Sequence, residues 1–295
     1  MVDAHALLIV TDKSRTSNAQ LAAGLKLLKD TGVEITEEVP KHPGQLPDLI
    51  RRYRSRVDRI IIGGGDGALN AAAEAMLESR VPLGILPLGT ANDLARTLGI
   101  PLNLRKACEI IARGHLHEVD LGWVNGKHFF NAASIGLGAL VTRKLSGAVK
   151  GKWGAWSYSR IAWDAFKGHR AFTAEITCDG TVYSVSSIHI AVGNGRFYGG
   201  GMAIRSDAAI DDHRLDLYSL EPQPIWKLIK LAPELKRGQQ CPQEGFLVLK
   251  GREIDIHTHR PKWVSADGEL TTRTPARFRV IPSALPIYVA EPRQG

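Results

Sequence analysis

The sequence has few cysteines and no long apolar run, and each shortage excludes a class of protein. Its three cysteines are far apart and lack CxxC spacing, which argues against a disulfide framework and against a zinc site. We expect Cys108, Cys178 and Cys241 to be reduced packing residues. No run reaches the ~20 apolar residues of a membrane-spanning helix, and the first residues lack a secretory signal pattern. A cytoplasmic protein is therefore expected.

Positive charge is in excess, with a formal net charge of +8, and it calls for an acidic partner. Nucleotide, nucleic acid and anionic membrane all qualify. No nucleic acid is expected, because no reading helix or RNA-binding signature accompanies the cations. Cations alternate with aromatic residues between positions 140 and 170, as suits a bilayer headgroup layer: Arg143, Lys144, Lys150, Lys152, Arg160, Lys167 and Arg170 with Trp153, Trp156, Tyr158, Trp163 and Phe166. A smaller group of the same kind follows in Trp226, Lys227, Lys230, Lys236 and Arg237.

The same pattern between positions 140 and 170 also fits a simple amphipathic helix with buried aromatic residues, and both interpretations stay open. Membrane binding rests on the tryptophan and tyrosine residues beside lysine and arginine, because the net charge alone does not choose among acidic partners. It predicts a protein associated peripherally with the inner face of the membrane.

The length of 295 residues predicts two domains. Up to about residue 122, unbroken apolar runs alternate with helical segments, which predicts an α/β domain with a parallel sheet over residues 1–122. The expected strands are 6–10, 33–35, 57–62 and 83–86, and the expected helices are 18–30, 46–54, 68–78, 91–98 and 104–113.

Beyond residue 122 the pattern changes to strand-like pieces between Asp-Gly, Asn-Gly and Pro-containing turns, which predicts an all-β sandwich domain over residues 123–282. The final segment, 283–295, is expected to return to the first domain, and a cleft is expected between the domains where the glycine loop opens. The expected strands are 172–178, 182–192, 215–220, 246–249, 253–257, 263–266 and 277–281.

The most informative stretch is residues 59–70, where a β-branched run leads into Gly-Gly-Gly-Asp-Gly and then into a helical segment. Glycines let main-chain N–H groups approach an anion, and a helix N-terminus adds partial positive charge, so this junction predicts a polyphosphate site. Asp66 would act through a cation, most simply magnesium on a nucleotide. A tight turn without a ligand is the alternative.

A second strand-to-helix junction, residues 87–96, reads Pro-Leu-Gly-Thr-Ala-Asn-Asp-Leu-Ala-Arg. It offers a hydroxyl, an amide and a carboxylate from Thr90, Asn92 and Asp93 at a predicted helix start. The alternative is that Thr90 or Asn92 only caps that helix.

Together these two junctions resemble the diacylglycerol kinase catalytic family, which includes bacterial lipid kinases and the sphingosine and ceramide kinases. Later segments resemble the family's further motifs in the same order, so the resemblance covers nearly the whole chain: residues 130–138, 192–201, 209–216 and 267–269. It implies an NAD kinase/diacylglycerol kinase-like α/β domain followed by a β-sandwich. It also implies ATP and Mg²⁺ as cofactors and a lipid as substrate.

Carried over by position, the resemblance assigns three sets of residues. Glu269 would be the proton acceptor, with Asp267 beside it. A magnesium ion in the second domain would bind the Asp212 carboxylate and the carbonyls of Ala209 and Arg214. The nucleotide would bind at Gly64, Gly65, Asp66, Gly67, Ala68, Asn70, Thr90, Asn92 and Asp93. Alternatives remain, since Asp267-Gly268 resembles a plain hairpin turn and Asp211-Asp212 a solvated one.

Three departures from the family pattern bear on these roles. Ala68 stands where threonine is common, residues 11–15 replace the usual Asn-Pro-x-Ser-Gly, and His213 follows the metal-site aspartate where glycine is normal. If that last position needs positive φ, the histidine carries strain and the second-domain magnesium is in doubt.

The sequence predicts an ATP- and Mg²⁺-dependent kinase that transfers the γ-phosphoryl group to a hydroxyl of a membrane-derived, diacylglycerol-like lipid. Two alternatives stay open. One is a soluble small-molecule kinase of the NAD kinase type, although residues 89–93 and 193–195 favour the lipid kinases instead. The other is a catalytically silent nucleotide- or lipid-binding protein.

Overall fold

The computed structural model describes residues 4–11, 19–147, 170–224, 227, 237 and 245–291. Several residues of the predicted membrane-binding groups lie outside this part of the chain, as does Cys241: Lys150, Lys152, Trp153, Trp156, Tyr158, Arg160, Trp163, Phe166, Lys167, Trp226, Lys230 and Lys236. The chain divides into two compact units, one formed by Met1–Leu121 with Pro282–Gly295 and the other by Gly122–Ile281.

The first unit is built on a parallel sheet with the strand order β2-β1-β3-β4. Strands β1, β3 and β4 are largely buried apolar runs, as a sheet covered on both faces requires, whereas the edge strand β2 carries charged residues and buries only Val33. The four strands are β1 (Ala4–Val10), β2 (Val33–Glu38), β3 (Arg59–Gly64) and β4 (Leu83–Pro87). The predicted parallel α/β arrangement is therefore confirmed.

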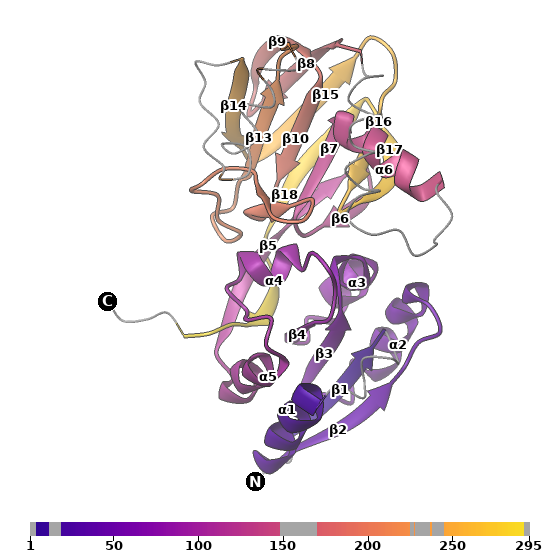
Figure 1. The fold of residues 1–295 in the computed structure, drawn as a ribbon, viewed down its shortest axis with the longest axis vertical. Helices are drawn as coiled ribbons and strands as arrows, with labels where there is room; N and C mark the ends of the chain where they lie inside the picture. The colour runs from indigo at the N-terminus through magenta and orange to yellow at the C-terminus, as the bar shows by residue number, and fades with distance from the viewer. Residues whose placement is uncertain are drawn as a thin grey trace. The chain divides into compact units, whose positions relative to one another are not determined.

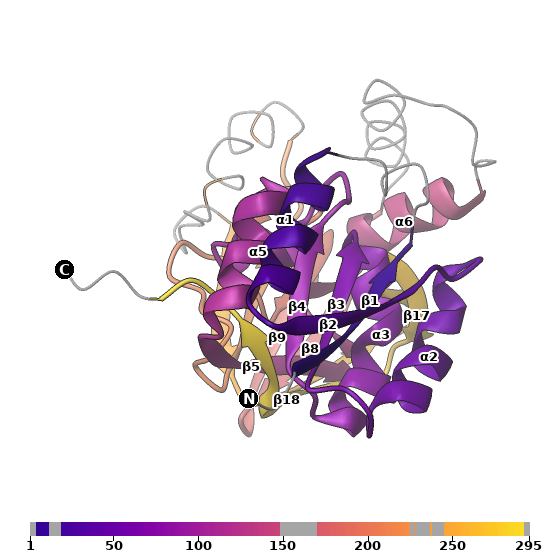
Figure 2. The ribbon, with the colours of Figure 1, turned by 90° about the horizontal axis from the view of Figure 1, so that it is seen from below.

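Helices cover both faces of this sheet. Figure 2 shows α1 and α5 side by side on one face and α2 and α3 on the other. Their bounds are α1 (Ala19–Asp30), α2 (Leu46–Tyr53), α3 (Asp66–Ser79) and α5 (Leu104–Arg113), with a 3₁₀ turn η2 (Pro43–Gln45) before α2. The buried cysteine Cys108 lies on α5 and forms no disulfide, as expected.

One helix of the first unit is shorter than predicted. The sequence predicts a helix over 91–98, whereas α4 spans only Asp93–Thr97. Asn92 has φ 52°, in the left-handed region, so the chain cannot continue the helix backwards through this residue. The residues before α4 therefore form a loop.

The second unit is a sandwich of two sheets, as predicted. One sheet has the order β14-β13-β10-β7-β16-β17, and the other contains β18, β15, β8 and β9. Their inner faces share one apolar core, which includes Phe129, Ile190, Leu217 and Phe278. Figure 1 shows α6 (Leu137–Gly147) across the β7–β16–β17 end of the six-stranded sheet.

The strands of this unit lie close to the predicted ranges, with two exceptions. The strand expected over 277–281 is part of the longer β18 (Ala276–Tyr288), whose residues from Pro282 onward belong to the first unit. Instead of a single strand over 182–192, the chain forms β9 (Thr181–Ser187) and β10 (His189–Gly193). The chain changes sheets at Ile188, since β9 pairs with β8 whereas β10 pairs with β7 and β13. The other predicted strands are β8 (Phe172–Cys178), β13 (Leu215–Leu220), β14 (Phe246–Gly251), β15 (Glu253–Thr258) and β16 (Trp263–Ala266).

Several further elements have no counterpart among the predicted segments. Besides α6, these are β5 (Leu116–Val124), β6 (Lys127–Phe129), β7 (Ala132–Gly136), β11 (Phe197–Tyr198), β12 (Met202–Ala203) and β17 (Glu269–Arg273). None of the helices in the described part of the chain combines the length and hydropathy needed to span a bilayer.

Candidate functional site

The two glycine-containing turns of the first unit meet main chain against main chain. A Cβ at Gly65 would lie 2.9 Å from the Gly89 Cα, and one at Gly89 would lie 2.4 Å from the Gly65 Cα. Side chains cannot be accommodated at such distances. The Leu88 N–H also donates to the Gly64 carbonyl at 3.0 Å, so the ends of β3 and β4 are joined at this point.

Asp66 links the two turns through a hydrogen bond. Its Oδ1 accepts the N–H of Leu94 at 3.2 Å, in the first turn of α4. The carboxylate is half-buried and occupies the first position of α3. Asp66 therefore begins α3, and its side chain accepts a hydrogen bond from a main-chain N–H group at the start of α4 that has no acceptor within that helix.

Asn92 closes the second turn and does not cap α4. Its Oδ1 accepts the Gly89 N–H at 2.8 Å, and its Nδ2 donates to the Gly89 carbonyl at 2.9 Å. The Asn92 side chain makes no capping bond to α4, so the alternative of simple capping by Asn92 does not hold. Asn92 and Asp93 are buried, while Thr90 is exposed on the turn between them and β4.

The N-terminus of α3 is open. Gly67 is exposed, and a Cβ there would meet no atom within 4 Å. The first N–H groups of a helix point out of it and have no intrahelical acceptor. Asn70 is half-buried one turn further on, whereas Ala68 is buried. The Thr11 N–H donates to the Gly63 carbonyl at 3.0 Å, and residues 12–15 lie outside the described part of the chain.

In the second unit, the Asp267 carboxylate gathers three consecutive main-chain N–H groups. Its Oδ2 accepts from Phe130 at 2.7 Å, and its Oδ1 accepts from Asn131 at 3.0 Å and from Ala132 at 3.1 Å. Asp267 and Gly268 have φ of 45° and 81°, which is the geometry of a tight hairpin between β16 and β17. The hairpin alternative is thus correct for the backbone of Asp267 and Gly268. The Asp267 carboxylate, in addition, binds the main chain of residues 130–132.

The loop ahead of β7 is fixed from its other side by Asn194. The Asn194 Nδ2 donates to the Phe130 carbonyl at 2.9 Å, and its N–H donates to the Asn131 carbonyl at the same distance. Both asparagines are buried. Side chains from two distant motifs therefore hold one short segment of main chain.

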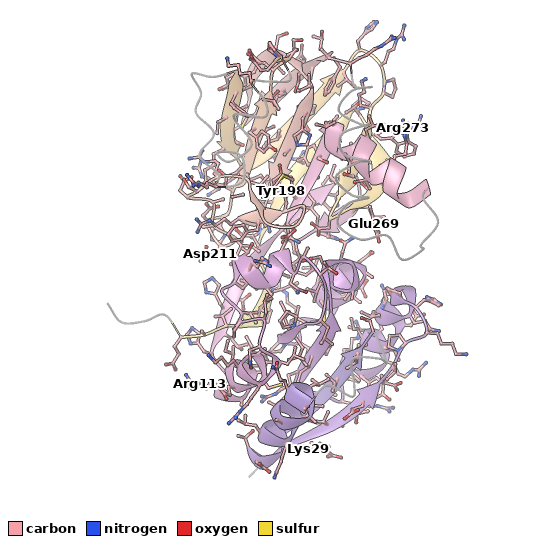
Figure 3. All side chains as sticks on the ribbon, viewed as in Figure 1. Lys29, Arg113, Tyr198, Asp211, Glu269 and Arg273 are labelled. Carbon is pink, nitrogen blue, oxygen red and sulfur yellow. The ribbon has the colours of Figure 1, made fainter. Side chains whose placement is uncertain are left out.

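Glu269 follows this network directly. It is exposed and begins β17, opposite Ala266, while Arg273 ends the strand (Figure 3). Its carboxylate is accessible, in contrast to the hydrogen-bonded one of Asp267. Glu269 is therefore the member of the Asp-Gly-Glu sequence that can meet a substrate.

The third predicted set, Ala209, Asp212 and Arg214, lies in the loop ahead of β13. Asp212 accepts the Arg214 N–H with Oδ1 at 3.0 Å, and its Oδ2 lies 2.6 Å from the Nζ of Lys250. His213 has φ 58°, so the positive φ considered from the sequence is present. Figure 3 labels the exposed neighbour Asp211 on this loop.

Charged side chains surround this loop. Burial raises the pKa of the Asp216 carboxyl to about 6, against the lowering effect of the Lys250 and Arg205 charges. Arg205 is hydrogen-bonded to Asp207, which lowers the pKa of that carboxyl. Within the part of the chain that the structure describes, no three His, Cys, Asp or Glu side chains form a group able to hold a metal ion.

Comparisons with known proteins agree with this arrangement. Residues 5–124 match the diacylglycerol kinase catalytic domain, and residues 131–289 match the YegS C-terminal NAD kinase beta sandwich-like domain. A relative from Enterobacter sp. (strain 638), named "Probable lipid kinase YegS-like", is 33% identical over 95% of this chain and 94% of its own length. A protein of the same name from Yersinia enterocolitica is 31% identical over 95% of both chains.

Among solved structures, the chain is similar to one from Bacillus anthracis str. Sterne that is classed provisionally as a diacylglycerol kinase. The two are 27% identical, with a TM-score of 0.80 over 97% of each chain. Fold and matched domains together define a kinase with an α/β catalytic domain and a C-terminal sandwich. The chain belongs to the diacylglycerol kinase catalytic-domain family, in the group that carries the YegS C-terminal domain.

Sequence reasoning did not single out three residues that shape these sites. Asn131 and Asn194 lie in the motif-like segments 130–138 and 192–201, which predict no role for either residue. Lys250 directly follows the strand predicted over 246–249, and nothing in its neighbours marks it. The register of the two strands could have identified Lys250, because it pairs directly with Asp216 across β13 and β14.

Proposed function

We propose that this protein is an ATP- and Mg²⁺-dependent lipid kinase, which transfers the γ-phosphoryl group to a hydroxyl of a membrane-derived, diacylglycerol-like lipid. The observation that carries the proposal is the joining of the two glycine turns at Gly65 and Gly89, beside the open N-terminus of α3. Such a junction favours phosphate, since main-chain N–H groups and the helix dipole both attract an anion. The names of the relatives, probable lipid kinases, support the class of acceptor.

The nucleotide phosphates would bind at Gly64, Gly65 and Gly67, with Asn70 on α3 and Thr90 on the second turn nearby. The Leu94 N–H donates to Oδ1 of the Asp66 carboxylate, and the same carboxylate would hold a cation bound with the nucleotide. Magnesium bound with the nucleotide would neutralise phosphate charge during the transfer. The buried Asn92 and Asp93 would hold the shape of the second turn, not touch the phosphates.

For the transfer, we assign proton acceptance to the Glu269 carboxylate. The lipid hydroxyl oxygen forms a bond to the γ-phosphorus, the bond from that phosphorus to the bridging oxygen breaks, and ADP leaves. The hydroxyl proton passes to Glu269. Asp267 acts as a positioning residue, because its carboxylate is occupied by three N–H groups and fixes the turn that presents Glu269.

Phosphate transfer from labelled ATP to a total lipid extract tests the proposal. Asp66→Asn and Glu269→Gln should each lower the rate by about 100-fold or more. Asp48→Asn on α2 and Glu175→Gln on β8, two exposed carboxylates away from both sites, are the matched controls and should keep full activity. Full activity in Asp66→Asn or Glu269→Gln would remove the role assigned to that residue, and absence of any labelled lipid with the native protein would contradict the function.

We further propose that the enzyme works in the cytoplasm at the anionic inner face of the membrane. The support is the net charge of +8 and the alternation of cations with aromatic residues between positions 140 and 170. In a sedimentation assay, vesicles that contain phosphatidylglycerol should bind the protein, and added salt should release it. Equal binding to neutral vesicles would show that charge does not direct the association.

A further inference from the structure

Lys250 reaches the loop that the family resemblance assigns to a divalent cation. It lies on the edge strand β14, directly opposite Asp216 of β13. Its Nζ is 2.6 Å from Oδ2 of Asp212. The two side chains are 27% and 24% exposed, so this ion pair is largely shielded from solvent.

Both oxygens of the Asp212 carboxylate have a partner. Oδ1 accepts the Arg214 N–H, and Oδ2 pairs with Lys250. Magnesium binds oxygen at about 2.1 Å and is surrounded by about six ligands. An ammonium group 2.6 Å from the same oxygen repels the ion and takes its space. As arranged here, Asp212, Ala209 and Arg214 do not fit a magnesium ion.

The local charges are already balanced to within one unit. Three carboxylates, from Asp207, Asp212 and Asp216, face the cations of Arg205 and Lys250. The Nε of Arg205 lies 3.5 Å from the Asp216 carboxylate, which is 2% exposed. Two side-chain cations thus supply the two positive charges that a divalent ion would bring, and a metal ion added to them would leave the cluster positive.

The turn itself keeps the shape that a glycine would allow. His213 has φ 58°, a left-handed conformation that costs a non-glycine residue about 1 kcal/mol. The bond from the Arg214 N–H back to Asp212 closes the turn around it. The loop therefore retains a defined backbone with an ammonium group as its cation.

We infer that the Lys250 ammonium replaces the divalent cation of the second unit, so that the loop ahead of β13 is held by a side chain and needs no metal ion. The magnesium that accompanies the nucleotide in the proposed function is a separate ion. The two ideas are tested apart, because all measurements on Lys250 are made without nucleotide and without an activity readout.

Thermal unfolding of the nucleotide-free protein in MgCl₂ and in EDTA is the first test. The native protein and Asp212→Asn should respond alike to Mg²⁺. Lys250→Ala should unfold about 3 °C lower, and MgCl₂ or CaCl₂ should restore the lost stability because Asp212 can then bind a metal ion. The double variant Lys250→Ala/Asp212→Asn should show no recovery. Lys127→Met, at an exposed lysine of β6, is the control and should unfold like the native protein.

Two outcomes would overturn the inference. One is a Mg²⁺-dependent rise in the native Tm that Asp212→Asn abolishes. The other is a destabilised Lys250→Ala that gains no response to either ion, since Lys250 would then not stand in the metal's place.

Mn²⁺ binding followed by electron paramagnetic resonance keeps the inference testable if Lys250→Ala does not fold. The native protein and Asp212→Asn, both free of nucleotide, should bind the same number of Mn²⁺ ions. One additional ion in the native protein would show a metal site at Asp212 and would contradict the inference.

Discussion

In the first unit, Gly65 and Gly89 bring two main-chain turns into contact, whereas in the second unit the Asp267 carboxylate gathers three main-chain N–H groups. The first arrangement depends on the absence of side chains, and the second on one charged side chain. Each site is therefore sensitive to a different kind of substitution. Added volume should damage the glycine turns, and lost charge should damage the hairpin that carries Glu269.

Gly89→Ala should have the largest effect. Its Cβ would lie 2.4 Å from the Gly65 Cα, so one main chain must move. We expect a loss of stability of about 3 kcal/mol and a fall in kinase activity of at least 100-fold, roughly what misplacement near a reacting group costs. Urea unfolding and phosphate transfer measure the two effects.

Gly67→Ala is the matched control for volume, because a Cβ at that position would meet no atom within 4 Å. Its stability should equal or slightly exceed that of the native protein, since alanine favours a helix over glycine. A Gly89→Ala variant as stable as Gly67→Ala would show that the two turns are not in contact.

Asp267→Asn should have an intermediate effect. The asparagine oxygen can still accept hydrogen bonds, but its amide would face a main-chain N–H that Asp267 now binds. We expect the free energy of unfolding, measured with urea, to fall by about 2 kcal/mol. The kcat should fall while the KM for ATP stays unchanged, because Asp267 positions Glu269 and does not bind the nucleotide.

Glu175→Gln is the control for Asp267→Asn and should change neither stability nor kcat. A change in the KM for ATP without a change in kcat would contradict the positioning role.

The smallest expected effect is on the rate at which a reagent modifies two buried thiols, one in each unit. Burial raises the pKa of Cys108 to about 12 and also raises the pKa of Cys178. Below its pKa a thiol stays protonated and unreactive, so the modification rate of Cys108 by a disulfide reagent should not climb between about pH 7 and 9, as it does for an ordinary cysteine of pKa ~8.5.

In a Cys241→Ser background, denaturant should expose the two thiols to the reagent. Cys108 would then report opening of the first unit and Cys178 opening of the second. Rapid modification of either thiol in the native protein would show that its burial is incomplete.

The sequence was most informative where structure is local. Helix α5 and the strands β8, β13 and β16 lie within the ranges that periodicity predicted. The glycine turn after β3 and the helix that follows it were also predictable, since strand, turn and helix follow one another within a few residues. The predicted extension of α4 was wrong, because Asn92 adopts a left-handed conformation to close on Gly89.

Long-range pairing was not predictable in the same way. The carboxylate of Asp267 binds an N–H group 137 positions earlier, and no local pattern identifies which one. The single strand expected over 182–192 is divided because its halves pair in different sheets, a choice made by partners far along the chain.

By itself the sequence determined the α/β and sandwich classes, the order of the motifs and the membership in a kinase family. Apolar periodicity and glycine content act over short distances and are written directly in the chain. The tertiary structure adds the hydrogen bond from the Leu94 N–H to Asp66, the three N–H groups on the Asp267 carboxylate and the ion pair of Lys250 with Asp212. Each of these contacts joins a carboxylate to a donor from a separate part of the chain, so it exists only once the strands and helices that carry the two groups have packed.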